Sequence, residues 1–243
     1  MTSPLTTSIT RYALAFTFAF AALLPARNTW AARPFITDDA RLTTAGSCQL
    51  ESWMRSYPDN RQVWALPACN PGGNLEFTMG GGRSKDTGVE ATVDQVFQLK
   101  TLFRPMETND WGGGVAIGVV RHPSTTPGPN ALGNTFAYLP LSRSLLDDQL
   151  ILHGNAGWSK DRASGLNGMT WGAGGEYKIG TRFLAIAESF GDNHTSPYWQ
   201  VGGRFSIIPD TLQVDMTVGK QFSGPDSGRW MSFGLRFTPA KLF

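Results

Sequence analysis

Two short sequences place a histidine two residues before a serine, a spacing that could serve nucleophilic catalysis. They are His122-Pro123-Ser124 and His194-Thr195-Ser196. A serine nucleophile needs a neighbouring base, and the base needs an acid that orients it. Glu188 stands on an otherwise apolar strand face and is the candidate acid. Pro123 disturbs strand geometry and both pairs fall between predicted strands, so hydrolysis is the alternative function and not the leading one.

The remaining chemistry-bearing residues form no recognisable ligand set. His153 lies with Asn155 on a polar strand face, and we expect it to be a hydrogen-bonded interior residue. No cluster has the spacing of a metal site, and the sequence has no phosphate-binding loop, dinucleotide fingerprint or haem attachment motif. We therefore expect neither a metal nor a cofactor.

The composition points away from most soluble enzymes. The chain has 243 residues, which suits one large domain or two small ones. Charged residues make up 16% of it, against about 25% in ordinary soluble domains, while hydrophobic residues reach 41% and aromatic residues 12%. The mean hydropathy of −0.19 argues against a helical membrane protein. A β-sheet protein with alternating apolar and polar residues satisfies all of these values.

Residues 1–31 have the pattern of a secretory signal peptide. Arg11 precedes an apolar run from Tyr12 to Leu24 that is too short to span a bilayer as a helix, and Thr29 and Ala31 suit cleavage near Ala31. This segment carries two of the 21 basic residues and none of the 19 acids. The mature chain is therefore balanced in charge, which gives no electrostatic reason to expect nucleic-acid binding.

Beyond this segment the dominant pattern is alternation with a period of two residues. Helical spacing is nearly absent, and clusters of Gly, Pro, Asn and Asp interrupt the alternation. The pattern predicts twelve strands, near residues 47–56, 61–69, 74–81, 88–104, 111–121, 133–143, 149–158, 168–178, 182–190, 197–207, 211–219 and 229–237.

The segment 88–104 shows the alternation most fully. All its charged residues share one face, and the other face has none. At about 3.3 Å per residue it would be a strand of roughly 50 Å, which suits a tilted strand that extends beyond a bilayer. By the same parity, we expect polar residues from several strands to line an interior: Glu90, Asp94, Gln98, Lys100, Glu176, Lys178, Arg204, Asp215 and Arg236.

The connections between predicted strands favour a barrel over a sandwich. Odd-numbered connections have about 4, 6, 11, 9, 6 and 9 residues, and even-numbered ones about 4, 6, 5, 3 and 3. Long loops at one end, short turns at the other and an even strand count are typical of outer-membrane barrels. We predict an all-β, antiparallel, up-and-down transmembrane barrel over residues 47–243, with about 12 strands and a range of 10–14. Tryptophans near strand ends suggest a membrane-interface belt: Trp53, Trp64, Trp111, Trp158, Trp199 and Trp230.

The two cysteines are expected to pair. Cys48 and Cys69 are centred on Tyr57-Pro58-Asp59-Asn60, whose proline and Asp-Asn pair predict a tight turn. A hairpin folded there places Cys48 across from Cys69 and Trp53 across from Trp64. An oxidising compartment would then produce a cross-strand disulfide, and two unpaired thiols are the alternative.

Asp38 and Asp39 form an acidic pair in the segment 32–46, which precedes the barrel as a periplasmic or lumenal segment. The pair could enter the lumen and meet Lys100, Arg104 or Arg236. From the sequence alone we favour a flexible leader. The oxygen spacing of a calcium loop is missing.

The start of the mature chain is similar to that of a known family. Arg33-Pro34-Phe35-Ile36-Thr37-Asp38-Asp39-Ala40 is followed by a cysteine-bearing strand that ends in Glu51-Ser52-Trp53. With the twelve-strand pattern, this opening resembles bacterial exported proteins assigned to the outer membrane and associated with phenol meta-cleavage pathways. The resemblance implies a barrel that passes small, often aromatic, compounds. The terminal Phe243 resembles a barrel-assembly signal, although Thr238 to Phe243, with Pro239, follow the last alternating strand.

Together these observations predict a passive channel or transport-like protein of the bacterial outer membrane, and not an enzyme. Its expected partners are outer-membrane lipid, a small solute that is aromatic or hydrophobic, and the barrel-assembly machinery. Both signs of charge occur among the interior candidates, so they could equally form a salt-bridge network that plugs the barrel. An outer-membrane lipid-modifying hydrolase with a His-x-Ser pair and a soluble periplasmic β-protein are the alternatives.

Overall fold

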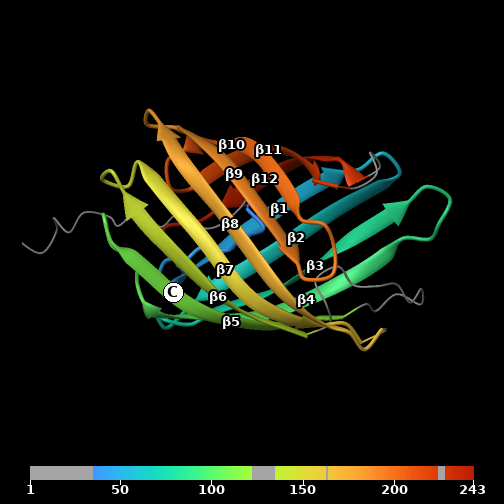
Figure 1. Ribbon diagram of the computed structural model, residues 1–243. Coiled ribbons are helices and arrows are strands. Elements are labelled where there is room, and N and C mark those ends of the chain that lie inside the picture. Colours follow the sequence, from blue (N-terminus) through green and yellow to red (C-terminus); the bar gives the residue numbers. More distant parts are fainter. Residues whose placement is uncertain (1–34, 122–134, 163, 224–227) are drawn as a thin grey trace, which may run out of the picture.

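The chain forms a closed barrel of twelve antiparallel strands (Figure 1). This computed structural model describes residues 35–121, 135–162, 164–223 and 228–243. Each strand pairs with its neighbours in sequence, and β1 pairs with β12 to close the sheet. The predicted all-β barrel of about twelve strands is thus confirmed, whereas the expected signal peptide lies outside the described residues. The strands are β1 (Ser47–Ser56), β2 (Asn60–Asn70), β3 (Glu76–Asp86), β4 (Thr92–Arg104), β5 (Trp111–Arg121), β6 (Thr135–Leu145), β7 (Leu150–Lys160), β8 (Asn167–Ile179), β9 (Phe183–Asp192), β10 (Tyr198–Ile208), β11 (Leu212–Gln221) and β12 (Trp230–Phe237).

The alternation of residue types explains which side of the sheet faces outward. Apolar side chains such as Ile117 stay 52% exposed, while charged side chains such as Lys100 and Glu176 are only 3% exposed. The reverse would hold in a water-soluble sandwich, whose apolar faces are buried between two sheets. An uncharged outer band around a polar interior is the arrangement of a barrel whose outside meets lipid. Closure also leaves no unpaired strand edge.

The two ends of the barrel differ. One end, which we call the turn end, carries the short connections 71–75, 105–110, 146–149, 180–182 and 209–211, together with the start of β1 and the end of β12. The other, which we call the loop end, carries 57–59, 87–91, 122–134, 161–166, 193–197 and 222–229. The longest connection, 122–134, lies outside the described residues.

The predicted strand 88–104 begins later than expected. β4 starts at Thr92, and β3 continues to Asp86, so the hairpin turns further along the chain than the alternation suggested. Gly88 has a φ of +78°, a left-handed backbone conformation that glycine adopts without steric cost. Glu90 therefore lies in an exposed connection and does not line the interior.

The first hairpin follows the prediction closely. Cys48 pairs with Cys69 and Trp53 with Trp64 across β1 and β2, and a disulfide joins the two cysteines. The predicted disulfide is confirmed. The indoles of Trp53 and Trp64 stack with centroids 5.7 Å apart. Register places both on the inner face, and Trp230 also faces inward and is only 5% exposed, so these three tryptophans do not belong to a membrane-interface belt. Trp111 and Trp158, each 39% exposed, are compatible with such a belt.

Two further features complete the described chain. The last strand ends at Phe237, and the Phe243 backbone N–H donates to the Gly46 carbonyl at 3.0 Å, beyond the ladder that closes the barrel. Among the described residues, no helix is long and apolar enough to cross a membrane.

Candidate functional site

Residues 35–46, which we call the inner segment, lie inside the barrel. Their hydrogen bonds and ion pairs reach side chains on β3, β4, β6, β7, β8 and β9. β3 and β9 are half a circuit apart in a ring of twelve strands and therefore lie on opposite walls. A chain that contacts opposite walls occupies the cross-section of the lumen. The flexible leader that the sequence favoured is thus wrong for these residues.

Glu188 of β9 holds the beginning of the inner segment. Its two carboxylate oxygens accept the backbone N–H groups of Ile36 at 2.7 Å and Thr37 at 2.8 Å. The side-chain amide of Gln200 donates to the same carboxylate. Glu188 is only 5% exposed, so this carboxylate would be costly to bury without such donors. The acid that stood out on an apolar face is the clamp of the inner segment.

Other wall side chains complete the backbone hydrogen bonding of the inner segment. It has no partner strand, so buried N–H groups need acceptors from side chains. Asn155 makes two hydrogen bonds to the backbone of Asp38: its side-chain oxygen accepts from the Asp38 N–H, and its side-chain NH₂ donates to the Asp38 carbonyl. The contacts are Asp38 N to Asn155 Oδ1 at 2.6 Å, Asn155 Nδ2 to Asp38 O at 2.8 Å, Ala40 N to Ser142 Oγ at 2.9 Å and Thr43 N to Glu76 Oε2 at 2.6 Å.

An ionic network fixes the middle of the inner segment. Lys100 Nζ lies 2.8 Å from Asp38 Oδ1 and 3.5 Å from Asp39 Oδ1. The Tyr138 hydroxyl donates to the other Asp38 oxygen at 2.7 Å. Arg41 Nη1 of the inner segment lies 3.0 Å from Glu176 Oε1 on β8. Because these groups are withdrawn from water, each charge depends on its partner.

Of the three cations proposed for the acidic pair, Lys100 forms the ion pairs. Arg104 lies at the turn end, where it pairs with Asp110 at 2.5 Å and stacks on Trp111. The backbone N–H of Trp111 and the Arg104 side chain donate to Asp110 and hold the pKa of that carboxyl below its ordinary value. Arg236 donates to Gln213 and Gln49 at 3.4 and 3.3 Å.

Small residues and an apolar contact let the inner segment approach β8 and β9. A Cβ at Gly172 would lie 2.4 Å from Thr37 Oγ1, so only glycine permits this approach. The ring of Phe35 packs with Leu184 and Ile186 in a small buried cluster. Apolar burial thus adds to the polar contacts at the start of the inner segment.

The histidines do not support the hydrolase hypothesis as stated. His122 and Ser124 lie outside the described residues, and His194 is exposed and contacts the Asn167 carbonyl at 2.9 Å. Glu188 is occupied by the inner segment, so its assignment as the orienting acid was wrong.

His153 is a buried interior residue, as expected. Its Nδ1 lies 2.8 Å from Ser142 Oγ and its Nε2 lies 3.6 Å from Glu176. Although a Ser-His-Glu set is suggestive of catalysis, the hydroxyl of Ser142 already accepts the Ala40 N–H and is buried beneath the inner segment. Among the described residues, no group of three or more His, Cys, Asp or Glu side chains could hold a metal ion.

The loop-end half of the lumen carries aromatic side chains. Tyr57, Phe190, Tyr198 and Trp230 form what we call the aromatic cluster, with ring centroids 5.6–6.3 Å apart. The guanidinium of Arg55 lies 5.3 Å from the Trp230 ring. Phe136 and Tyr138 stack on the opposite wall. Trp230 Nε1 is buried and has no hydrogen-bond partner among the described residues.

Comparison with known proteins agrees with this architecture. A family described as "Uncharacterised conserved protein UCP029691" matches residues 19–238. The chain belongs to this family. No curated protein matches it in sequence. The description of the family names no phenol pathway, so that part of the resemblance gains no support.

Solved outer-membrane channels share the fold. A KdgM porin has a TM-score of 0.61 at 10% identity, over 78% of this chain and 98% of the porin. A NanC porin has a TM-score of 0.53 at 13% identity, over 80% and 100%. The COG4313 outer membrane channel from Pseudomonas putida F1 has a TM-score of 0.53 at 12% identity, over 83% and 98%. The chain therefore shares the barrel fold of these outer-membrane channels.

The structure brings several of the nine interior candidates together. Buried on the inner face are Lys100, Glu176, Arg204, Asp215 and Arg236, while Asp94, Gln98 and Lys178 are inward-facing and partly exposed. Lys100 and Glu176 hold the inner segment, and Gln98 lies 3.1 Å from the Tyr138 hydroxyl. Glu90 alone is outside the strands.

Sequence reasoning missed the wall residues that bind the inner segment: Glu76, Tyr138, Ser142 and Asn155, and Glu188 in its true role. Each occupies an inward position in the strand parity. Parity can place such residues inside, but it does not name their partner.

Proposed function

We propose that the protein is a passive channel of the bacterial outer membrane for small aromatic or hydrophobic solutes, closed at rest by the inner segment. The observation that carries the proposal is a lumen with two unlike halves. An aromatic-lined entrance at the loop end leads to a cross-section occupied by residues 35–46. Passage then requires that the inner segment leave its wall contacts or shift among them.

The aromatic cluster suits ring-containing solutes. Aromatic faces in offset or edge-to-face contact attract each other by about 0.5–1.5 kcal/mol beyond their buried area. Phenols are suitable test solutes because their ring can stack on the aromatic cluster and their hydroxyl can form hydrogen bonds with its tyrosine hydroxyls. The solved KdgM porin in complex with disordered oligogalacturonate supports solute binding in barrels of this fold.

The orientation proposed here places the loop end outside the cell. Outer-membrane barrels carry short turns on the periplasmic side and longer loops outside. The inner segment then enters the lumen from the periplasm, since it leads directly into β1 at the turn end. Residues 1–31 would act as the signal peptide for export, and the barrel-assembly machinery would insert the strands.

The decisive experiment compares permeability with and without the Glu188 clamp. Glu188→Gln keeps the side-chain shape but places an NH₂ group against one of the two backbone N–H donors. The loss of a charged hydrogen bond costs about 2 kcal/mol, so the displaced population should rise roughly thirtyfold. Liposome swelling with phenol and planar-bilayer conductance should both increase. Glu107→Gln, the same change in an exposed turn, should behave as the wild type.

Two outcomes would contradict the proposal. A wild-type barrel that already conducts freely, with no change in Glu188→Gln, would show that the inner segment does not close the lumen. A barrel that stays impermeable even when residues 35–44 are deleted would show that the protein is not a channel. In both cases, heat-modifiable migration on a gel confirms that the barrel has folded.

A further inference from the structure

On the described strands, the sign of a charged side chain is related to the direction in which the side chain points. Every acid faces the interior: Glu51, Glu76, Asp86, Asp94, Glu176, Glu188, Asp192 and Asp215. Outward-facing charges are all cations: Arg61, Arg83, Lys85, Arg104, Arg121, Arg143, Lys160 and Lys220. Arg104 and Arg143 lie at the turn end, where they pair with Asp110 at 2.5 and 3.5 Å, whereas the others lie near the loop end. Among the described residues, outward-facing cations without a carboxylate partner are therefore found at the loop end only.

Three of these cations are neighbours, and we call them the basic cluster: Arg61, Arg83 and Lys85. Arg61 lies directly across from Lys85 in the ladder between β2 and β3, and Arg83 precedes Lys85 on the same face. Like charges in directly opposed positions destabilise a sheet. Among the described residues, no carboxylate lies within 4.0 Å of any of the three. No ion pair with a carboxylate in the described part of the chain therefore offsets their mutual repulsion.

A groove of about 420 Å³ accompanies the basic cluster at the rim. All three cations line it, together with Val63 and the turn residues that follow β1. Asp59 and Asp86 line it too, but Asp86 accepts a hydrogen bond from Asn60 at 2.5 Å on the inner face. The groove keeps an excess of positive charge.

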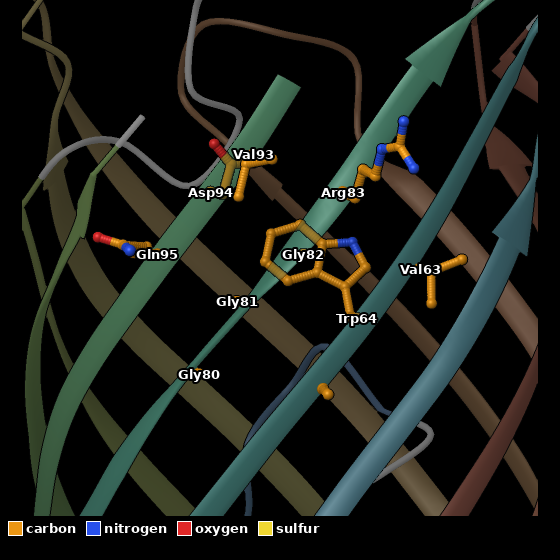
Figure 2. Close-up of a pocket in the computed structure, with 10 residues that line it drawn as sticks. Val63, Trp64, Gly80, Gly81, Gly82, Arg83, Val93, Asp94 and Gln95 are labelled. Atoms are coloured by element: carbon orange, nitrogen blue, oxygen red, sulfur yellow. The ribbon is translucent and has the colours of Figure 1, made fainter. Parts of the chain in front are cut away.

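A second groove, of about 390 Å³, continues from the rim along the barrel wall. Figure 2 shows the part of this groove that has no side chains, Gly80–Gly82 of β3. Arg83 and Val63 lie at one end of it, and Val93 and Gln95 lie on the adjacent strand, β4. Val63 is 51% exposed and Val93 is 40% exposed, and both belong to the outer apolar band. A bound molecule here would meet cations at its head and apolar wall along its length.

We propose that the basic cluster binds the phosphorylated headgroup of a lipid in the leaflet at the loop end. Guanidinium groups bind phosphate oxygens in bidentate geometry, and lysine adds a point charge. Clusters of basic residues next to a membrane-spanning surface attract anionic lipid. A lipid fits better than free phosphate because the groove runs from the cations onto the surface that meets hydrocarbon. This site is on the outer wall and is independent of whether the lumen conducts.

The test measures lipid binding by detergent-solubilised barrel with native mass spectrometry. The probes are bisphosphorylated lipid A, its dephosphorylated form and inorganic phosphate. The variant is Arg61→Gln/Arg83→Gln/Lys85→Gln. The matched control is Arg121→Gln/Lys160→Gln/Lys220→Gln, which removes the same charge from outward positions on three different strands. Heat-modifiable migration verifies that both variants fold.

The wild type and the control should bind the phosphorylated lipid about tenfold more tightly than the cluster variant does, and all three should bind the dephosphorylated form weakly. Inorganic phosphate at the same concentration should not displace the lipid. Equal binding by the two triple variants would overturn the proposal, since charge alone and not the cluster would then be responsible. Displacement by inorganic phosphate would also overturn it, because the site would then hold a free anion.

Discussion

The two halves of the lumen use different interactions. In the turn-end half, Lys100, Glu176 and Glu188 each meet a defined atom of the inner segment at hydrogen-bond or ion-pair distance. In the loop-end half, Tyr198 and Trp230 meet their neighbours through ring contacts near 6 Å, and Trp230 Nε1 has no described partner. One half fits one chain segment, and the other, in the proposed function, would receive ring-shaped solutes of more than one kind.

This difference follows from the energetics of burial. A buried charge must be paired and hydrogen-bonded, so the turn-end half accepts only a segment with charges in matching positions. Aromatic contacts are individually modest, and a ring can make them in either offset-stacked or edge-to-face geometry. Closure and selectivity can therefore be changed separately, and each half offers mutations that leave the other intact.

The largest effect is expected from Lys100→Met. It removes the cation from two acids, Asp38 and Asp39, of which Asp39 is 1% exposed. Breaking a buried ion pair costs about 3–5 kcal/mol, but release of the inner segment into water limits the loss. We expect the segment to leave the lumen, which limited trypsin digestion at Arg41 would detect.

The control for Lys100→Met is a triple variant that also neutralises the two acids. Adding Asp38→Asn and Asp39→Asn removes the uncompensated acids and should restore much of the protection from trypsin. If Lys100→Met alone stays as resistant as the wild type, the ionic network does not hold the inner segment.

Particular residues show how far the sequence predicted this arrangement. Period-two alternation located every strand, and the symmetric spacing of Cys48 and Cys69 about one turn gave the first register. Both signals are local, because strand parity and hairpin pairing depend on neighbouring residues. The docking of Asp38 on Lys100 joins residues that are 62 positions apart, and no local pattern encodes such a pair.

Glu188 shows the limit of interpretation from parity most clearly. An acid among apolar residues was visible as an anomaly, and the only role proposed for it was that of the orienting acid in the alternative hydrolase hypothesis. The alternation does not reveal that the apolar face of β9 points inward, where Leu184 and Ile186 pack on Phe35. Once that face is placed inside, the acid must bind a partner in the lumen.

An intermediate effect is expected when the Cys48–Cys69 disulfide is removed. The change should lower the stability of the barrel wall and leave the inner segment in place. Cys48 and Cys69 close a loop with a sequence separation of 21, for which loop entropy predicts a stabilisation of about 3 kcal/mol. Cys48→Ser/Cys69→Ser should lower the urea midpoint of barrel unfolding. Trypsin resistance at Arg41 should stay at the wild-type level below that midpoint. Loss of both together would show that wall and inner segment are coupled.

The smallest effect is expected in the aromatic half, from Tyr198→Leu. Tyr198 stacks on Phe190 with centroids 5.6 Å apart and is partly exposed to the lumen. Its loss should weaken the binding of a ring-shaped solute by about 1 kcal/mol, or roughly fivefold. The measurement is the phenol concentration that halves the ion current through a barrel opened by Glu188→Gln.

Tyr177→Leu makes the same change on the outward face of β8, where Tyr177 is 42% exposed, and it should leave this concentration unchanged. Tyr198→Leu should also leave the trypsin resistance of the inner segment unchanged, since no described hydrogen bond of the segment reaches Tyr198. If the two tyrosine variants alter phenol block equally, the aromatic cluster does not bind the solute. The division of the lumen into a closing half and a selecting half would then fail, because the loop-end rings would be no more than wall packing.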